Sequence, residues 1–182
     1  MNYIKTDIEG VYILEPKVFK DDRGYFTETY RKSDFDQNIG HDTNFIQDNQ
    51  SKSSQGVLRG LHYQKGEFSQ AKLVRVIKGA VVDVAVDLRQ DSKTFGRHIM
   101  VELSAQNMRQ LFVPRGFAHG FQVLSEEAEF IYKVDNHYAP QAECTIAYND
   151  PALNIEWPIK DRVILSDKDL NHAVAFADAE KF

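Results

Sequence analysis

Apolar and polar residues alternate along many short segments of the chain, and turn residues separate these segments. In the clearest example, residues 72–88, Gly79 divides two such segments. The second segment carries apolar residues on one face, at Val82, Val84, Val86 and Leu88. Asp83 and Asp87 fall on its other face. Because side chains alternate between the two faces of a strand, this pattern predicts β-structure.

Similar alternation predicts further strands at residues 25–30, 45–51, 57–63, 98–103, 121–124 and 129–134. Helical patterns are few. Residues 33–36 could open a short helix with Ser33 as its N-cap. Residues 166–169 have the spacing of a capping box and could start another short helix. Many short strands and few helices favour an all-β jelly roll, whose interior can hold a ligand.

Composition narrows the classes of protein that fit this pattern. The chain has 182 residues, 42% of them hydrophobic, which suits one domain over residues 1–182. A net charge of -5 gives no reason to expect a nucleic acid or an anionic membrane as partner. Cys144 is the only cysteine, and no apolar run approaches the ~20 residues of a membrane helix. We therefore expect a cytoplasmic protein.

Two segments resemble the metal-binding motifs of the cupin superfamily of jelly rolls. In the first, Gly56 precedes His62, but Gln64 stands where a second histidine would be. The second, residues 114–119, has the pattern Pro-x-Gly-x-x-His and ends at His119. Two histidines fall short of the three protein ligands that catalytic zinc normally takes. We therefore expect a cupin-like double-stranded β-helix without metal or cofactor, although Glu67 could supply a third ligand.

Without a metal, His62 could act as a general base, because the ordinary pKa of histidine, ~6.5, lies near working pH. The alternative is a hydrogen-bonded core histidine. His62 shares strand parity with Leu58, so we expect it to point into the same interior.

Lys72 and Tyr132 also interrupt apolar faces. Lys72 shares parity with Val74 and Val76, and an inward lysine costs free energy unless it is paired or functional. It could instead extend its ammonium to water from the start of the strand. Tyr132 could be a core tyrosine with a satisfied hydroxyl. With His62, these residues would supply a base, a cation and a phenolic acid to one cavity.

Ten segments, in order, resemble the signatures of the dTDP-4-dehydrorhamnose 3,5-epimerase family. They are residues 19–28, 47–51, 56–62, 70–76, 113–121, 132–133, 138–140, 143, 149–151 and 165–169. The resemblance implies a metal-free cupin homodimer that acts on a dTDP-keto-sugar in the synthesis of dTDP-L-rhamnose for surface polysaccharide.

The resemblance also implies roles for individual residues. His62 would be the base, Asp169 would orient it and Tyr132 would donate the proton. Tyr138 would stack on thymine. The other residues expected to contact the sugar nucleotide are Arg23, Phe26, Glu28, Gln47, Asp48, Asn49, Arg59, Lys72, His119, Glu143 and Lys168. In dimers of the family, the partner subunit supplies some of them.

Other functions stay open at this stage. The chain departs from the family's usual residues at Tyr148, near Thr145 and at residues 171–173, outside the catalytic set. Related enzymes invert only one carbon, so a single-carbon epimerase is an alternative. A metal-dependent cupin enzyme and a catalytically silent sugar-nucleotide binder are the others.

Overall fold

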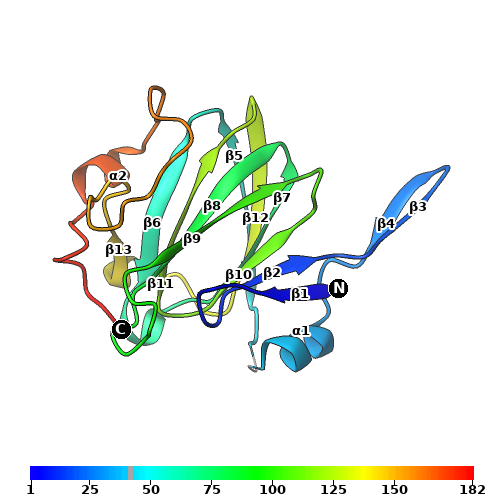
Figure 1. Cartoon of the computed structure of the whole chain (residues 1–182), viewed down its shortest axis with the longest axis horizontal. Coiled ribbons are helices and arrows are strands. Elements are labelled where there is room, and N and C mark those ends of the chain that lie inside the picture. Colours follow the sequence, from blue (N-terminus) through cyan, green and yellow to red (C-terminus); the bar gives the residue numbers. More distant parts are fainter. Residues whose placement is uncertain (41–42) are drawn as a thin grey trace.

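The computed structural model describes residues 1–40 and 43–182, and within them two β-sheets face each other while a hairpin projects to one side (Figure 1). Sheet A has the order β1 (Asn2–Lys5), β2 (Tyr12–Glu15), β10 (Gln110–Val113), β7 (Lys72–Lys78), β12 (Glu127–Val134) and β5 (Gln47–Ser54). Sheet B has the order β13 (Glu143–Thr145), β6 (Leu58–Gln64), β11 (Phe117–Val123), β8 (Ala80–Asp87) and β9 (His98–Ser104). The projecting hairpin consists of β3 (Val18–Asp21) and β4 (Gly24–Thr27). This is the cupin-like jelly roll that the sequence predicts.

Two of the three apolar clusters among the described residues form layers on the two sides of sheet B, and both involve β8. The layer between the sheets joins residues such as Val74 and Phe130 of sheet A to Val81 and Phe121 of sheet B. The layer on the outer side of sheet B contains the face predicted from sequence, Val82, Val84, Val86 and Leu88. There it packs against the C-terminal segment, which includes Trp157. β8 is therefore buried on both faces, and its aspartates lie in the protein interior.

The short helices lie at the edges of the sandwich. Helix α1 (Lys32–Ile39) covers part of sheet A through Phe35 and Ile39, which lie one helical turn apart. The predicted Ser33 cap is wrong, because Phe35 N–H donates to the carbonyl of Arg31 and the helix begins one residue after Arg31. Helix α2 (Asp167–Asn171) confirms the other prediction, since Ser166 is its N-cap.

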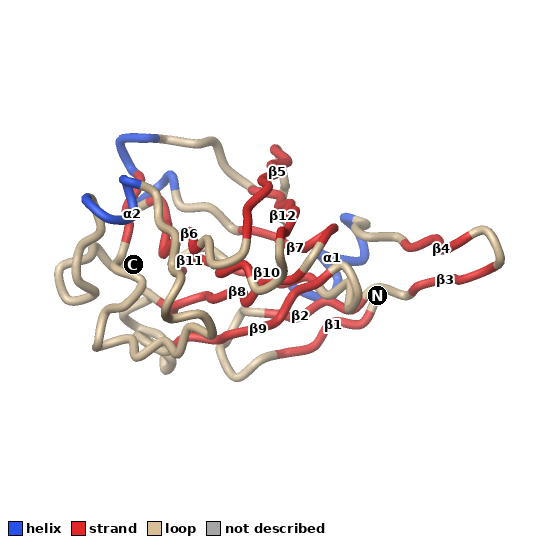
Figure 2. Tube along the Cα trace, turned by 90° about the horizontal axis from the view of Figure 1, so that it is seen from above, coloured by secondary structure: helices blue, strands red, loops and turns tan. Residues whose placement is uncertain are grey.

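The arrangement seen from above places the β3–β4 hairpin at the opposite end of the molecule from α2 and the C-terminus (Figure 2). Its apolar side chains are exposed: 51% for Phe19, 62% for Tyr25 and 68% for Phe26. The strand predicted over residues 25–30 is shorter in the structure, because β4 ends at Thr27.

An irregularity in the pairing of β6 with β11 decides which side chains face the interior. Leu58 lies opposite Gln122 and Arg59 opposite Phe121, but His62 lies opposite His119. Three residues on β6 thus span two on β11, which is a β-bulge. Leu58 packs in the outer layer, whereas Phe121 belongs to the inner one. The parity argument from Leu58 to His62 is therefore wrong, although His62 does face the interior, because the bulge reverses the alternation between them.

Glycine makes this bulge sterically feasible. Gly60 has φ +139°, and a Cβ added there would stand 2.6 Å from Gly120 Cα on the neighbouring strand. A Cβ added at Gly120 would stand 2.7 Å from the Arg59 carbonyl oxygen. Side chains at either position would force the two strands apart.

Candidate active site

A cavity between the sheets gathers most of the residues singled out from the sequence. It consists of adjoining hollows of about 290 and 260 Å³ that share Asn49, His62, Lys72 and Tyr132. The first hollow is also lined by Gln47, Tyr63, Gln64, Gln70, Val134, Tyr138 and Glu143. The second is also lined by Gln50, Ser51, Arg59, His119, Phe121 and Phe130. Residues from six strands, β5, β6, β7, β11, β12 and β13, therefore line one space.

His62 and Asp169 form a hydrogen-bonded pair in the wall of this cavity. His62 lies on β6, and its Nε2 contacts Asp169 Oδ1 at the start of α2. Ser166 Oγ donates to Asp169 Oδ2 at 2.8 Å and accepts from the Asp169 N–H at 3.2 Å, so the carboxylate is fixed by its own helix cap. Burial raises the pKa of Asp169, but the bonds from His62 and Ser166 outweigh it and hold that pKa below its ordinary value. An ionised Asp169 can only accept in this hydrogen bond, so Nε2 carries the proton of the neutral imidazole and Nδ1 is left as the basic atom.

Lys72 begins β7 and extends into the cavity from sheet A. Burial lowers its pKa to about 8, while the charges of Asp83 and Glu143 act against the fall. Below this pH the lysine presents a poorly solvated positive charge. Such a charge strongly attracts an anion that develops next to it.

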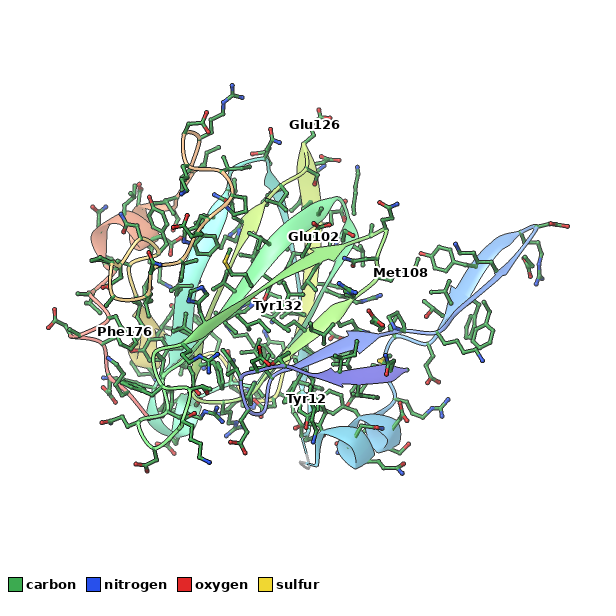
Figure 3. The ribbon with its side chains drawn as sticks, in the orientation of Figure 1. Tyr12, Glu102, Met108, Glu126, Tyr132 and Phe176 are labelled. Carbon is green, nitrogen blue, oxygen red and sulfur yellow. The ribbon has the colours of Figure 1, made fainter. Side chains whose placement is uncertain are left out.

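Tyr132 lies near the centre of the molecule, across the cavity from β6 (Figure 3). On sheet A it stands opposite Val74 of β7 and Asn49 of β5, and it packs against the inner apolar layer. Burial raises the pKa of its hydroxyl, Arg59 opposes the rise and Glu143 adds to it. The phenol therefore keeps its proton near neutral pH and is able to donate it.

His119 is hydrogen-bonded deep in the cavity. Its Nε2 lies 2.9 and 3.1 Å from the carboxylate oxygens of Asp83, and both residues are buried. The sequence pattern placed Asp83 on the face of β8 opposite the valines but gave it no role. A polar residue on a strand that is buried on both faces was the only signal available.

The mouth of the cavity carries paired polar groups. Glu143 forms an ion pair with Lys168 and accepts a hydrogen bond of 2.6 Å from the Tyr138 hydroxyl. Gln47 Nε2 donates to Asn49 Oδ1 at 2.8 Å. Arg59 is exposed, and its guanidinium donates to Ser53 Oγ at 3.1 and 3.2 Å.

Four of the predicted binding residues lie away from this cavity. Arg23 and Phe26 are on the projecting hairpin, where Arg23 pairs with Asp21. Glu28 is exposed and pairs with Arg31. Asp48 points to the outer side of sheet A, where it pairs with Lys133. In one subunit, therefore, these side chains do not join the others.

The donor set does not complete a metal site. Gln64, at the position of the missing histidine, donates to the carbonyls of Phe68 and His137 and accepts from the Ala139 N–H. His62 is hydrogen-bonded to the carboxylate of Asp169, and His119 to that of Asp83. Within residues 1–40 and 43–182, no cluster of three or more His, Cys, Asp or Glu side chains could bind a metal ion. The same ranges contain no helix long and apolar enough to cross a membrane.

Comparison with known proteins identifies the family of this chain. Residues 5–177 match the model of the dTDP-4-dehydrorhamnose 3,5-epimerase family. The protein of that name from Shigella flexneri is 53% identical over 182 residues, which cover 100% of this chain and 99% of the relative. The chain belongs to the dTDP-4-dehydrorhamnose 3,5-epimerase family.

Solved structures of other members of the 3,5-epimerase family have the same fold. The dTDP-6-deoxy-D-glucose-3,5-epimerase of Legionella pneumophila, solved with dTDP-4-keto-L-rhamnose, has a TM-score of 0.91 and 47% identity, covering 95% of this chain and 92% of that one. A 3'-monoepimerase from Streptomyces bikiniensis, solved with dTDP-quinovose, has a TM-score of 0.87 and 36% identity, covering 93% and 86%. The two structures are named for different stereochemical outcomes.

Proposed function

We propose that this chain inverts C3 and C5 of dTDP-4-dehydro-6-deoxy-D-glucose and so produces dTDP-4-dehydro-L-rhamnose. The observation that supports this function best is the arrangement of His62 and Tyr132 on facing sheets, with Lys72 in the same cavity. Inversion requires that a proton leave one side of a carbon and return from the other. A base and an acid on opposite walls of one cavity provide that chemistry.

The reaction starts at a C–H bond next to the 4-keto group. His62 Nδ1 takes the proton, and the electron pair of that bond moves to the C4 oxygen to give an enolate. Asp169 stabilises the imidazolium that forms, as a carboxylate does in other His–Asp pairs. The Lys72 ammonium stabilises the charge on the C4 oxygen. The ketone itself accepts the electrons, so the step needs no cofactor.

The reaction ends with a proton from the other wall. Tyr132 gives its hydroxyl proton to the carbon of the enolate on the face opposite His62, and the C4 carbonyl forms again. Before the second centre reacts, the imidazolium of His62 releases its proton to solvent and the tyrosinate takes one up, so both groups return to their starting states. Applied at C3 and at C5, the same sequence inverts both centres.

The nucleotide end of the substrate would lie at the mouth of the cavity. Arg59 and Lys168 are the cations suited to the diphosphate, because the guanidinium fork and the ammonium both pair with phosphate oxygens. Lys168 is paired with Glu143, which also holds Tyr138. Tyr138 is 57% exposed, which leaves its ring accessible for stacking on thymine.

The projecting hairpin supports a homodimer, with residues 1–182 as one cupin-like epimerase domain in each subunit. Phe19, Tyr25 and Phe26 expose more apolar surface than an isolated hairpin favours. In a dimer they would cover the partner subunit and bring Arg23 and Phe26 to its substrate. Light scattering should give twice the mass of the chain for the wild type. A cytoplasmic location remains a prediction, to be tested by cell fractionation.

The test is proton NMR of dTDP-4-keto-6-deoxyglucose with the enzyme in deuterated water, following C3 and C5 separately. The wild type should exchange and invert both positions. Tyr132→Phe should exchange protons slowly with retained configuration and give little inverted product. Tyr3→Phe is the control, because its hydroxyl bonds Asp34 far from the cavity. If Tyr132→Phe inverts the sugar normally, a residue other than Tyr132 must donate the proton.

The same spectra test the alternatives. Exchange and inversion at one carbon only would indicate a single-carbon epimerase, the outcome named for the Streptomyces bikiniensis structure. Binding without exchange at either carbon would indicate a silent sugar-nucleotide binder.

A further inference from the structure

Asp83 is a fully buried carboxylate that the proposed reaction leaves without a role. It lies on β8, opposite Phe121 of β11 and Val101 of β9, both members of the inner apolar layer. Its exposed fraction is 0%. Its carboxylate bonds His119 Nε2, and its charge acts on Lys72. A charge buried this completely is costly, so these neighbours must compensate it.

Lys72 and His119 line the same hollow from facing sheets, and His119 bonds Asp83 on the neighbouring strand. Lys72 is on β7 of sheet A, while Asp83 and His119 are on β8 and β11 of sheet B. Burial raises the pKa of Asp83, and His119 and Lys72 act against that rise. Of the two carboxylates that oppose the fall in the pKa of Lys72, Asp83 has the larger effect and Glu143 the smaller.

The remaining charged and titratable groups around Lys72 do not replace Asp83. They are Arg59, His62 and Tyr63 on β6, His119 on β11, Tyr132 on β12, Tyr138, and Glu143 on β13. Arg59 is a cation. His62 is hydrogen-bonded to Asp169, and Glu143 is paired with Lys168 and accepts from Tyr138. Apart from His119, Asp83 forms no ion pair among the residues described.

We propose that Asp83 is a positioning residue of the epimerase, which holds His119 in a fixed orientation and keeps the Lys72 ammonium charged where the C4 oxygen of the sugar binds. This inference rests on the proposed function for the identity of the sugar oxygen. The effect of the Asp83 charge on Lys72 does not require substrate, so it can be measured in the unliganded protein.

The experiment compares Asp83→Asn with wild type by the pH dependence of kcat/KM. Asparagine keeps the shape and an oxygen for His119 but removes the charge. Because an opposite charge nearby typically shifts a pKa by about 1–3, the alkaline limb should move down by about one pH unit or more. Asp87→Asn is the matched control, because Asp87 is equally buried on the same face of β8 but bonds Arg89, Ser92 and Thr94. Its alkaline limb should stay at the wild-type position.

A second measurement separates this proposal from the proposed function. The ¹³Cε resonance of Lys72, assigned by its loss in Lys72→Arg, is titrated without substrate. It should titrate at lower pH in Asp83→Asn. An unchanged titration would overturn the role of Asp83 even if the wild type epimerises the sugar normally. If the wild type fails to epimerise it, the titration still reports on Asp83.

A variant at Glu143 covers the case in which Asp83→Asn does not fold. Glu143→Gln removes the other carboxylate near Lys72. The Lys72 titration should then remain close to that of wild type. A fall as large as that expected for Asp83→Asn would show that Glu143 holds the charge, and would overturn the proposal.

Discussion

Replacing Asp169 by asparagine isolates the charge that supports the proposed base. The variant can keep both contacts: its side-chain oxygen can accept from His62 Nε2, and its amide can donate to Ser166 Oγ, which also accepts the backbone N–H that caps α2. The shape of the site should therefore survive. What disappears is the negative charge beside the imidazolium that forms when His62 takes a proton.

The structure sets the size of the effect. A hydrogen bond to a charged group contributes about 1.5–3 kcal/mol. Only 3% of the Asp169 side chain and 27% of the His62 side chain are exposed, so water screens the pair only in part. At about 1.4 kcal/mol for each factor of ten, kcat should fall about tenfold to about 150-fold. This is less than the loss expected for His62→Ala, about 10²–10⁴ or more.

The assay is the initial rate of deuterium incorporation and of product formation by NMR at neutral pH and saturating substrate. Both rates should fall together, because the charge acts on the first proton transfer. Asp167→Asn is the matched control, since Asp167 is exposed in the same turn of α2. A rate within twofold of wild type for Asp169→Asn, or an equal loss in both variants, would refute the reasoning.

Four further outcomes are expected. The kcat/KM should decline as pH rises through about 8, because burial lowers the pKa of Lys72 and the neutral amine no longer stabilises an enolate; a pH–rate profile checks this. Arg59→Ala and Arg23→Ala should each raise KM more than they lower kcat in steady-state kinetics, as expected for lost uniform binding. Turnover should survive exhaustive chelation, because Gln64 is engaged in loop hydrogen bonds; restoration by one divalent ion after a loss would contradict this. Gly120→Ala should lower the free energy of unfolding by about 1–3 kcal/mol in denaturant titrations, because its Cβ would meet the Arg59 carbonyl.

Local sequence patterns predicted more of the fold than of the candidate site. Alternation predicted β5 to β9, β11 and β12 but not β1, β2, β10 or β13. It succeeded most clearly where one face of a strand packs in an apolar layer, as in β7, β8 and β11. The Ser166 cap could be predicted because a capping box is local. Its Asp169 carboxylate reaches His62 across 107 residues of sequence, a contact that no local pattern encodes and that only the family resemblance supplied.

Two residues show why the rest of the site could not be predicted from local sequence patterns. Asp83 lies on a strand buried on both faces, where alternation no longer separates a solvent side from a core side. His62 faces the interior only because a bulge intervenes after Arg59. Parity counting assumes regular pairing, so a bulge reverses its result without leaving a reliable mark in sequence.

That bulge also bears on how the chain tolerates insertions and deletions. The cavity receives both Arg59 and His62, three positions apart, because β6 contains one more residue than regular pairing with β11 needs. Deleting Gly60 alone would leave Arg59 and His62 two positions apart, so both would still face the cavity, opposite Phe121 and His119 in regular pairing. Leu58 and Leu61 would likewise both stay in the layer around Trp157. A one-residue deletion elsewhere in β6, where pairing is already regular, would instead exchange inside for outside in the residues beyond it.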